Sequence, residues 1–236
     1  MLATRRFTSR LYLLALLLLF ATYILYSYPE PLHHSFFRPK PFPRPPSPAG
    51  AFQWHTRKER YPVPSHTKLP TSKPLHLPKI QYEFPRELKA AREERLERRE
   101  AVKISFMRSW DGYRAVAWGA DELKPLSKSY TKRFGGWATT LIGTLDTLWI
   151  MGLHGEFNQA VSKVAEIDFS TSEDEEINVF ETTVRILGGL LGAYDISGQK
   201  KEYGVLLEKA VQVGDFLMGS FDTGNRMPVL RWKWKR

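Results

Sequence analysis

The residues best suited to chemistry in this sequence are Glu181 and Arg185, one helical turn apart in the run NVFETTVRILGGLLG. The run begins at Asn178 and is otherwise almost entirely apolar. A carboxylate in such a setting is either held in an ion pair or used in a reaction. An i,i+4 Glu–Arg pair stabilises a helix by only about 0.2–0.5 kcal/mol. A carboxyl group at this place could instead donate a proton as a general acid.

The apolar residues around this pair recur at the spacing of a helix, which predicts one face packed against the core. The residues that carry this stripe are Phe180, Val184, Leu187 and Leu191. Gly188 and Gly189 remove side-chain bulk from the same helix, so another element could approach closely there. The sequence therefore predicts that Glu181 stands at the start of a helix in close contact with a neighbour.

Further helices are predicted on both sides of this one. Arg86–Glu100 is rich in alternating charges and predicts a solvated helical lead-in. Apolar periodicity then predicts helices at Thr140–Met151, Glu156–Ile167 and Lys200–Leu217, and a stripe on one more helix, formed by Val102, Phe106, Trp110, Tyr113 and Ala117. No segment shows sustained strand alternation. The predicted fold class is all-α, built from successive αα-hairpins.

Charge is divided unevenly along the chain. Its net value is +10, but residues 1–100 hold 18 Lys and Arg against 8 Asp and Glu, and residues 101–236 hold 17 of each. The predicted domain is therefore neutral, which argues against a nucleic-acid surface. The closing RWKWKR places Trp232 and Trp234 between cations, a pattern compatible with base stacking but too short to outweigh that argument.

The first 85 residues predict a membrane anchor and a stalk. The stretch from Leu11 to Tyr26 has no charge and no proline, and extends to Leu11–Tyr28 with interfacial residues; the arginines before it predict a cytoplasmic tail at 1–10 and a type II orientation. A cleaved signal peptide is the alternative, although no small-residue cleavage pattern follows. Proline-rich residues 29–85 predict an extended lumenal stalk, followed by the domain at 86–236.

Four runs in this domain resemble the class I α-1,2-mannosidases of glycoside hydrolase family 47. They are SWDGYRAVAWGADELKPLS from Ser109, GGWATTLIGTLDTLWIMGLHGEF from Gly135, VFETTVRILGGLLGAYDISG from Val179 and FDTGNRMPV from Phe221. The resemblance covers roughly Val102 to the C-terminus. It implies the first hairpins of an (αα)7 barrel, and a chain that is only the N-terminal portion of the family domain.

The resemblance also implies roles for single residues. Glu181 matches the general acid of an inverting hydrolysis, Arg185 matches an arginine beside that acid, and Asp146 matches an acidic residue of the sugar-binding floor. An adjacent cation and a helix N-terminus both favour an ionised carboxylate, so burial or a second carboxylate must keep such an acid protonated. Gly143 departs from the family, which usually has an acid there. For Asp121 and Glu122 a structural turn is the favoured interpretation.

Family members bind one Ca²⁺, whose ligands, like the catalytic base, would lie outside this chain. The acidic run Glu173–Glu176 lacks the spacing and the central glycine of an EF-hand and predicts a solvated loop. The resemblance thus implies a type II enzyme of the Golgi or endoplasmic reticulum membrane that trims N-linked high-mannose oligosaccharides, with this portion inactive alone. The alternative is a non-catalytic, membrane-anchored protein that binds a glycan or a partner.

Overall fold

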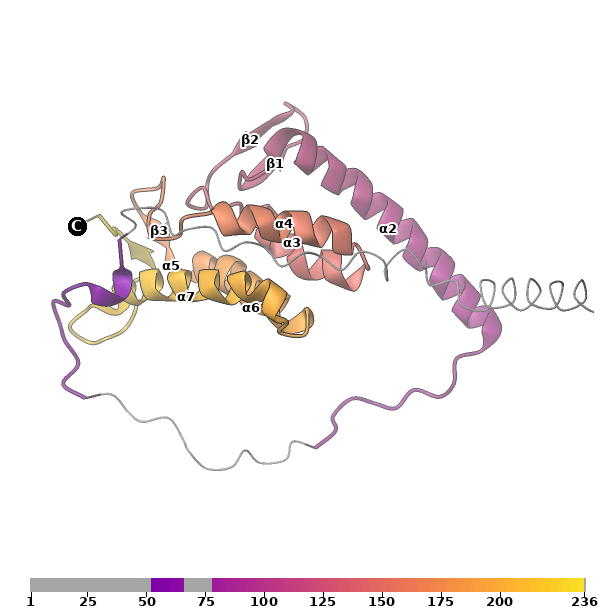
Figure 1. Cartoon of the computed structure of the whole chain (residues 1–236), viewed down its shortest axis with the longest axis horizontal. Coiled ribbons are helices and arrows are strands. Elements are labelled where there is room, and N and C mark those ends of the chain that lie inside the picture. Colours follow the sequence, from indigo (N-terminus) through magenta and orange to yellow (C-terminus); the bar gives the residue numbers. More distant parts are fainter. Residues whose placement is uncertain (1–51, 66–77, 236) are drawn as a thin grey trace, which may run out of the picture. The chain divides into compact units, whose positions relative to one another are not determined.

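Helices make up most of the described chain, and four short strands pair between them (Figure 1). The computed structural model describes residues 52–65 and 78–235, all within the unit Pro41–Arg236. The predicted anchor Leu11–Tyr28 lies outside the described residues. Within those residues, no helix is both long enough and apolar enough to cross a membrane.

The longest helix, α2 (Lys89–Ala117), joins the predicted lead-in and the predicted stripe into one continuous element. Its first half is charged and exposed, and Arg95 bonds Glu87 there at 2.7 and 2.8 Å. The stripe prediction is confirmed near the C-terminus of the helix, where Trp110, Tyr113 and Ala117 are buried. It is wrong at Val102, which is 58% exposed, because the core reaches only the last turns.

Two αα-hairpins follow α2, as the sequence predicts (Figure 1). The first consists of α3 (Thr139–Ile150) and α4 (His154–Glu166). In the second, α5 (Val179–Glu181), the π-helix η3 (Thr182–Leu187) and α6 (Gly188–Ile196) run on without a break, and α7 (Gly204–Met218) returns after the short turn η4 (Lys201–Tyr203). Helix α3 packs beside α6, and α4 packs beside α7.

The two hairpins approach each other closely at Gly189. A Cβ atom built on this residue would lie 2.9 Å from Ile142 Cγ2 and 3.3 Å from the Ile142 carbonyl oxygen. No larger side chain fits there without movement of α3, which confirms the predicted close approach at Gly189. Gly188 is exposed, and the nearest atom to its Cβ would be Thr183 O at 3.5 Å, so it does not share this role.

The prediction of which face of the Glu181 helix meets the core is wrong. Phe180 is 60% exposed and Val184 is 51% exposed. The buried face is one residue out of step with the predicted stripe and consists of Val179, Thr182, Ile186, Leu190 and Ala193. Both faces of this helix are apolar, so periodicity alone does not distinguish the one that meets the core.

The structure also contains two antiparallel ribbons that the sequence does not predict, because their strands have only two or three residues. β1 (Glu122–Lys124) pairs with β2 (Ser129–Thr131), and Leu123 lies opposite Tyr130. β3 (Ile177–Asn178) pairs with β4 (Arg231–Trp232), which comes from the other end of the second hairpin. Strands this short show no alternation in a sequence, and the second ribbon joins residues more than fifty positions apart.

Part of the predicted stalk packs on the domain. Residues 54–56 form the 3₁₀ helix η2 (Trp54–Thr56), and the Trp54 ring meets the rings of Phe216, Trp232 and Trp234 at centroid distances of 4.9, 5.3 and 6.3 Å. The prediction of a fully extended stalk at 29–85 is therefore wrong for residues 54–56. The two C-terminal indoles are engaged in the same aromatic cluster, which leaves little of them for base stacking.

Candidate functional site

The turn that carries Glu181 is fixed from two sides. Asn178 occupies the N-cap position of α5, and its side-chain Oδ1 accepts a hydrogen bond from the Glu181 backbone N–H at 3.1 Å. The Val179 N–H donates to Leu230 O at 3.0 Å, across the β3–β4 ribbon. Capping satisfies a donor that the helix start would leave free. The backbone of Glu181 is thus held by a side chain on one flank and a strand on the other.

The Glu181 side chain pairs with Arg185 as the sequence predicts. Arg185 Nε donates to Glu181 Oε2 at 2.5 Å, and the side chains are 51% exposed for the arginine and 27% exposed for the glutamate. Oε1 of Glu181 accepts no hydrogen bond from a described residue. The carboxyl group is therefore accessible, anchored at one oxygen and available at the other.

Arg185 has a second contact that the sequence did not indicate. Its guanidinium carbon lies 5.2 Å from the centre of the Phe134 ring, within the range of a cation–π interaction. Phe134 belongs to the loop before α3 and is 51 positions away in the chain. No sequence signal identifies such a pair, whereas Asn178, directly before an apolar helical run, carries an N-cap signal that could have been used.

The backbone between these groups is a π-helix. Residues 182–187 of η3 include Arg185 and directly follow Glu181. Such wide turns are rare and occur frequently at functional sites, because they change the direction of side chains within an otherwise regular helix. The glutamate, the arginine and the wide turn therefore coincide in one short stretch.

Asp146 is exposed on α3 and bonds its own neighbour in the chain. Its Oδ1 accepts hydrogen bonds from the Thr147 N–H at 2.6 Å and the Thr147 hydroxyl at 3.2 Å. No hydrogen bond or ion pair in the described part of the chain connects Asp146 with Glu181. Gly143, one turn earlier, is also exposed, and a Cβ atom there would meet nothing within 4 Å. The structure therefore shows open surface around Asp146 and leaves a sugar-binding role as a prediction.

Asp121 is fully buried and has the structural role that the sequence favours for it. Its Oδ2 accepts hydrogen bonds from the N–H groups of Phe134 and Gly136 at 2.8 and 3.0 Å. Its Oδ1 accepts from the N–H and hydroxyl of Thr139 at 3.1 and 3.2 Å. The carboxylate thus shapes the loop that enters α3, including the backbone of Phe134. Glu122 lies beside it in β1.

A buried tyrosine completes the interior around Asp121. The Tyr113 hydroxyl donates to Ala120 O at 2.8 Å. Burial raises the pKa of this hydroxyl above its usual range, and the nearby Asp121 charge acts in the same direction. Tyr113 therefore stays protonated and acts as a structural donor.

The described residues do not fit a metal. They contain no group of three or more His, Cys, Asp or Glu side chains that could hold an ion. The acidic run Glu173–Glu176 is only partly the predicted solvated loop, because Asp174 Oδ2 accepts from the Gly135 N–H at 2.8 Å and Glu173 pairs with Lys132 at 2.5 Å. These carboxylates are used in loop contacts and do not converge on a common centre.

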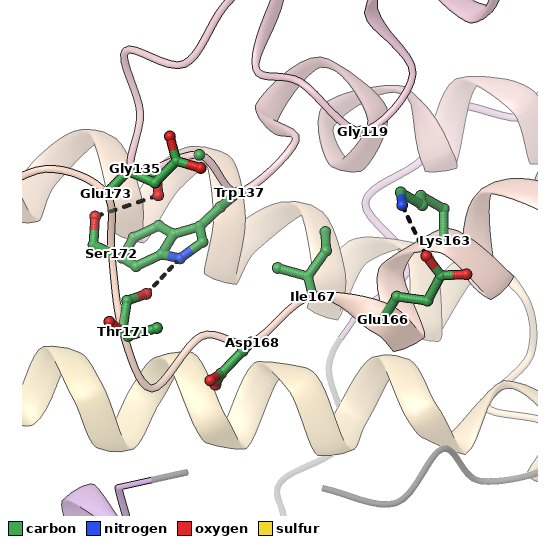
Figure 2. Close-up of a pocket in the computed structure, with 11 residues that line it drawn as sticks. Gly119, Gly135, Trp137, Lys163, Glu166, Ile167, Asp168, Thr171, Ser172 and Glu173 are labelled. Carbon is green, nitrogen blue, oxygen red and sulfur yellow. Dashed lines mark hydrogen bonds and ion pairs between the residues drawn. The ribbon is translucent and has the colours of Figure 1, made fainter. Parts of the chain in front are cut away.

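One hollow of about 360 Å³ lies beside the end of α4, and Glu181 is not among its lining residues (Figure 2). Its polar groups bond one another: Lys163 pairs with Glu166 at 2.8 Å, and Trp137 Nε1 donates to Thr171 O at 2.9 Å. None of the predicted site residues lines it. The hollow therefore offers few unsatisfied groups for a ligand, and the Glu181–Arg185 pair remains the candidate site.

Comparison with known proteins adds relatives for the region that holds this pair. An endoplasmic reticulum mannosyl-oligosaccharide 1,2-alpha-mannosidase of Rattus norvegicus is 46% identical over 133 residues, which is 56% of this chain and 19% of the relative. The corresponding enzyme of Homo sapiens is 44% identical over 131 residues, 56% of this chain and 18% of the relative. The chain spans about a fifth of the length of these curated relatives.

A solved structure supports the same relationship. The alpha-1,2-mannosidase from Trichoderma reesei superposes with a TM-score of 0.56 at 32% identity, covering 59% of this chain and 31% of that one. The family model of glycosyl hydrolase family 47 matches residues 105–236, more than half of the chain. Both hairpins and the Glu181–Arg185 pair fall inside the matched region. This chain belongs to glycosyl hydrolase family 47.

Proposed function

We propose that this chain supplies the general-acid part of an α-1,2-mannosidase that trims N-linked high-mannose oligosaccharides with inversion. The support is the family membership together with the names of the relatives, which are mannosyl-oligosaccharide 1,2-alpha-mannosidases. An (αα)7 barrel is the fold expected of the complete enzyme. Because the chain spans about a fifth of those relatives, the activity of a whole enzyme is part of the proposal.

The observation that carries the proposal is the free oxygen of Glu181. An inverting glycosidase needs one carboxyl group to protonate the leaving oxygen and a second, about 6.5–9.5 Å away, to activate water. Glu181 is partly exposed, held at one oxygen by Arg185, and without a described partner at the other. Arg185 would orient the acid and contact substrate, and Asp146 would bind a sugar hydroxyl at the open surface of α3.

The second carboxylate and Ca²⁺ are assigned to residues outside this chain. No described cluster fits the metal. With neither base nor metal ligands identified, we expect the 236-residue chain alone to release no mannose. What it provides is a positioned acid and its arginine.

The anchor Leu11–Tyr28 and the arginines before it support a single-pass type II membrane protein with a lumenal domain. Relatives named as endoplasmic reticulum enzymes support the early secretory pathway, and the Golgi apparatus remains the other location we propose. Expressing the full chain with a tag at each end and testing which tag a protease reaches on intact microsomes would check the orientation. A protected N-terminal tag would contradict it.

Release of free mannose tests the enzymatic proposal. The 236-residue chain and the product of its gene, read through any coding sequence after Arg236, are each incubated with a mannose-rich glycan and Ca²⁺. We expect mannose from a longer product only, and its loss on addition of a chelator. Release by the 236-residue chain, or release from the longer product that a chelator does not affect, would contradict the proposal.

A non-catalytic binding role is the second candidate, favoured by exposed apolar side chains on the second hairpin. Phe180, Val184 and Val211 are 60%, 51% and 56% exposed, more apolar surface than isolated exposed residues would give. Glycan binding without hydrolysis by every product of the gene would support this candidate over the enzyme. Binding that disappears in the Glu181→Gln variant would then point back to the acid site.

A further inference from the structure

Residues 52–61 lie ahead of the family-matched region, 105–236, yet they pack directly on it. Trp54 Nε1 donates to Ser170 O at 2.7 Å, in the loop between the hairpins. Its ring stands edge-on to Phe216 of α7 and to Trp232 of β4. One aromatic side chain from the N-terminal segment thus touches three separate parts of the domain.

The other end of this segment is fastened by carboxylates. Asp222 accepts hydrogen bonds from the backbone N–H groups of Arg60 and Tyr61, both at 2.8 Å. Glu59 pairs with Arg226 at 2.8 Å and with Arg57 at 3.3 Å. The hydrogen bond from Arg226 lowers the pKa of Glu59, and the bond from the Arg60 N–H lowers that of Asp222. Both carboxylates are therefore charged while the segment is docked.

The docking surface leads to the candidate site through the β3–β4 ribbon. Trp232, which Trp54 contacts, pairs with Ile177, and the next pair in the register joins Arg231 to Asn178. Asn178 is the residue whose side chain holds the Glu181 N–H. Trp232 also lies against Gly219, where a Cβ atom would be 2.4 Å from the indole. The indole therefore has little room to move while Trp54 covers it.

We propose that residues 52–61 form a clasp that immobilises the β3–β4 ribbon and thereby positions the turn that carries Glu181. The clasp acts on the glutamate through Trp54, Trp232 and Asn178 and makes no contact with the reacting groups. The clasp binds to the domain of the same chain. The value of this positioning for catalysis rests on the proposed function, but the coupling itself does not.

Amide hydrogen exchange in the full chain tests the coupling without any use of turnover. In Trp54→Ala we expect the amides of Trp232, Val179 and Glu181 to exchange about tenfold faster or more, since several aromatic contacts are lost. Trp54→Phe keeps an edge-on ring and should restore most of the protection. Lys58→Ala, at an exposed position of the same segment, is the matched control and should change none of these amides.

Asp222→Asn gives an independent variant if Trp54→Ala does not fold, because it weakens the other end of the clasp without removing aromatic volume. It should speed exchange at the same three amides. Unchanged exchange at Val179 and Glu181 in a folded clasp variant would overturn the proposal. A uniform rise through α3 and α4 would also overturn it, since Trp54 would then be an ordinary core residue. Absence of mannose release by a longer product of the gene would refute the proposed function and leave the clasp intact.

Discussion

Asp121 and Glu181 are both carboxylates at the entrance to a helix, but their surroundings are opposite. Asp121 is fully buried, and each of its oxygens accepts two hydrogen bonds from the loop it organises. Glu181 is partly exposed, and one of its oxygens bonds a single arginine. A carboxylate with every acceptor site used can build a loop but cannot act on a substrate. The contrast separates a structural acid from one with capacity for chemistry.

The two carboxylates are also connected through Phe134. Asp121 fixes the backbone of Phe134, and the Phe134 ring lies against the guanidinium that pairs with Glu181. The buried loop around Asp121, at the start of the first hairpin, thus supports the exposed Glu181–Arg185 pair at the start of the second. Substitutions in the Asp121 loop should therefore lower stability. Substitutions in the Glu181–Arg185 pair should lower activity with little loss of stability.

The largest loss of stability is expected for Asp121→Asn. The new amide nitrogen would face backbone N–H groups that now donate to a carboxylate, which leaves buried donors unpaired. We expect the free energy of unfolding to fall by about 3 kcal/mol, measured by urea denaturation. Its neighbour Glu122→Gln, in β1, is the control and should change stability by less than about 0.5 kcal/mol. A loss of less than about 1 kcal/mol for Asp121→Asn would contradict a structural role for Asp121.

Gly189→Ala extends the comparison to the contact between the hairpins. The added methyl group would lie 2.9 Å from Ile142 Cγ2 and 3.3 Å from the Ile142 oxygen, so α3 and α6 must separate at a cost of about 1–3 kcal/mol. Gly192→Ala, on the same helix with nothing within 4 Å, is the matched control. It should be neutral or stabilise by up to about 1 kcal/mol. Equal effects of the two changes would contradict the packing described.

Phe134→Leu tests the connection between the Asp121 loop and the Glu181–Arg185 pair. Leucine keeps apolar volume but removes the ring face under Arg185, and the loss of a cation–π contact at an exposed site is about 0.5–1 kcal/mol. We expect a small fall in thermal stability and, in an active form of the enzyme, a fall in rate because Arg185 is held less firmly. A variant with full stability and full activity would show that the ring does not position Arg185.

The smallest effect concerns pH and a third carboxylate, Asp222. The Arg60 N–H, the Tyr61 N–H and the charges of Arg226 and Arg57 hold its pKa below its usual value, and Glu59 beside it behaves alike. Its contribution to clasp docking is therefore present above about pH 4 and is lost as pH falls through the lowered value. Tryptophan fluorescence should stay constant from about pH 5 to 8 and change below about pH 4. A transition near neutral pH would contradict this.

Most helices of the domain could be predicted from sequence because they have a regular apolar period, and Gly152, Gly198 and Gly219 follow three of them. The predicted Thr140–Met151 differs from α3 by one residue at each end, and Gly152, with φ of +70°, ends it where a left-handed residue is needed. The predicted pair Glu181–Arg185 forms for the same reason, since residues four apart on a helix are neighbours.

The parts that could not be predicted depend on contacts between distant residues. Phe134 under Arg185, the β3–β4 ribbon and the docking of Trp54 each join segments that share no local pattern. The proline-rich composition of 29–85 also concealed Trp54, because composition averages over a single anchoring side chain. The sequence pattern assigns the wrong face of the Glu181 helix to the core, because both faces are apolar and only tertiary packing selects between them.

The central claim is that Glu181 is a catalytic acid and more than a helix ion pair. Its most direct test measures rate and melting temperature on the same samples of Glu181→Gln, in a gene product that releases mannose. Loss of an exposed i,i+4 pair is worth only about 0.3–0.5 kcal/mol, while loss of general-acid catalysis lowers the rate by about 10²–10⁴. We expect turnover to fall by that factor with an almost unchanged melting temperature. A Glu181→Gln protein that is less stable yet fully active would contradict the account.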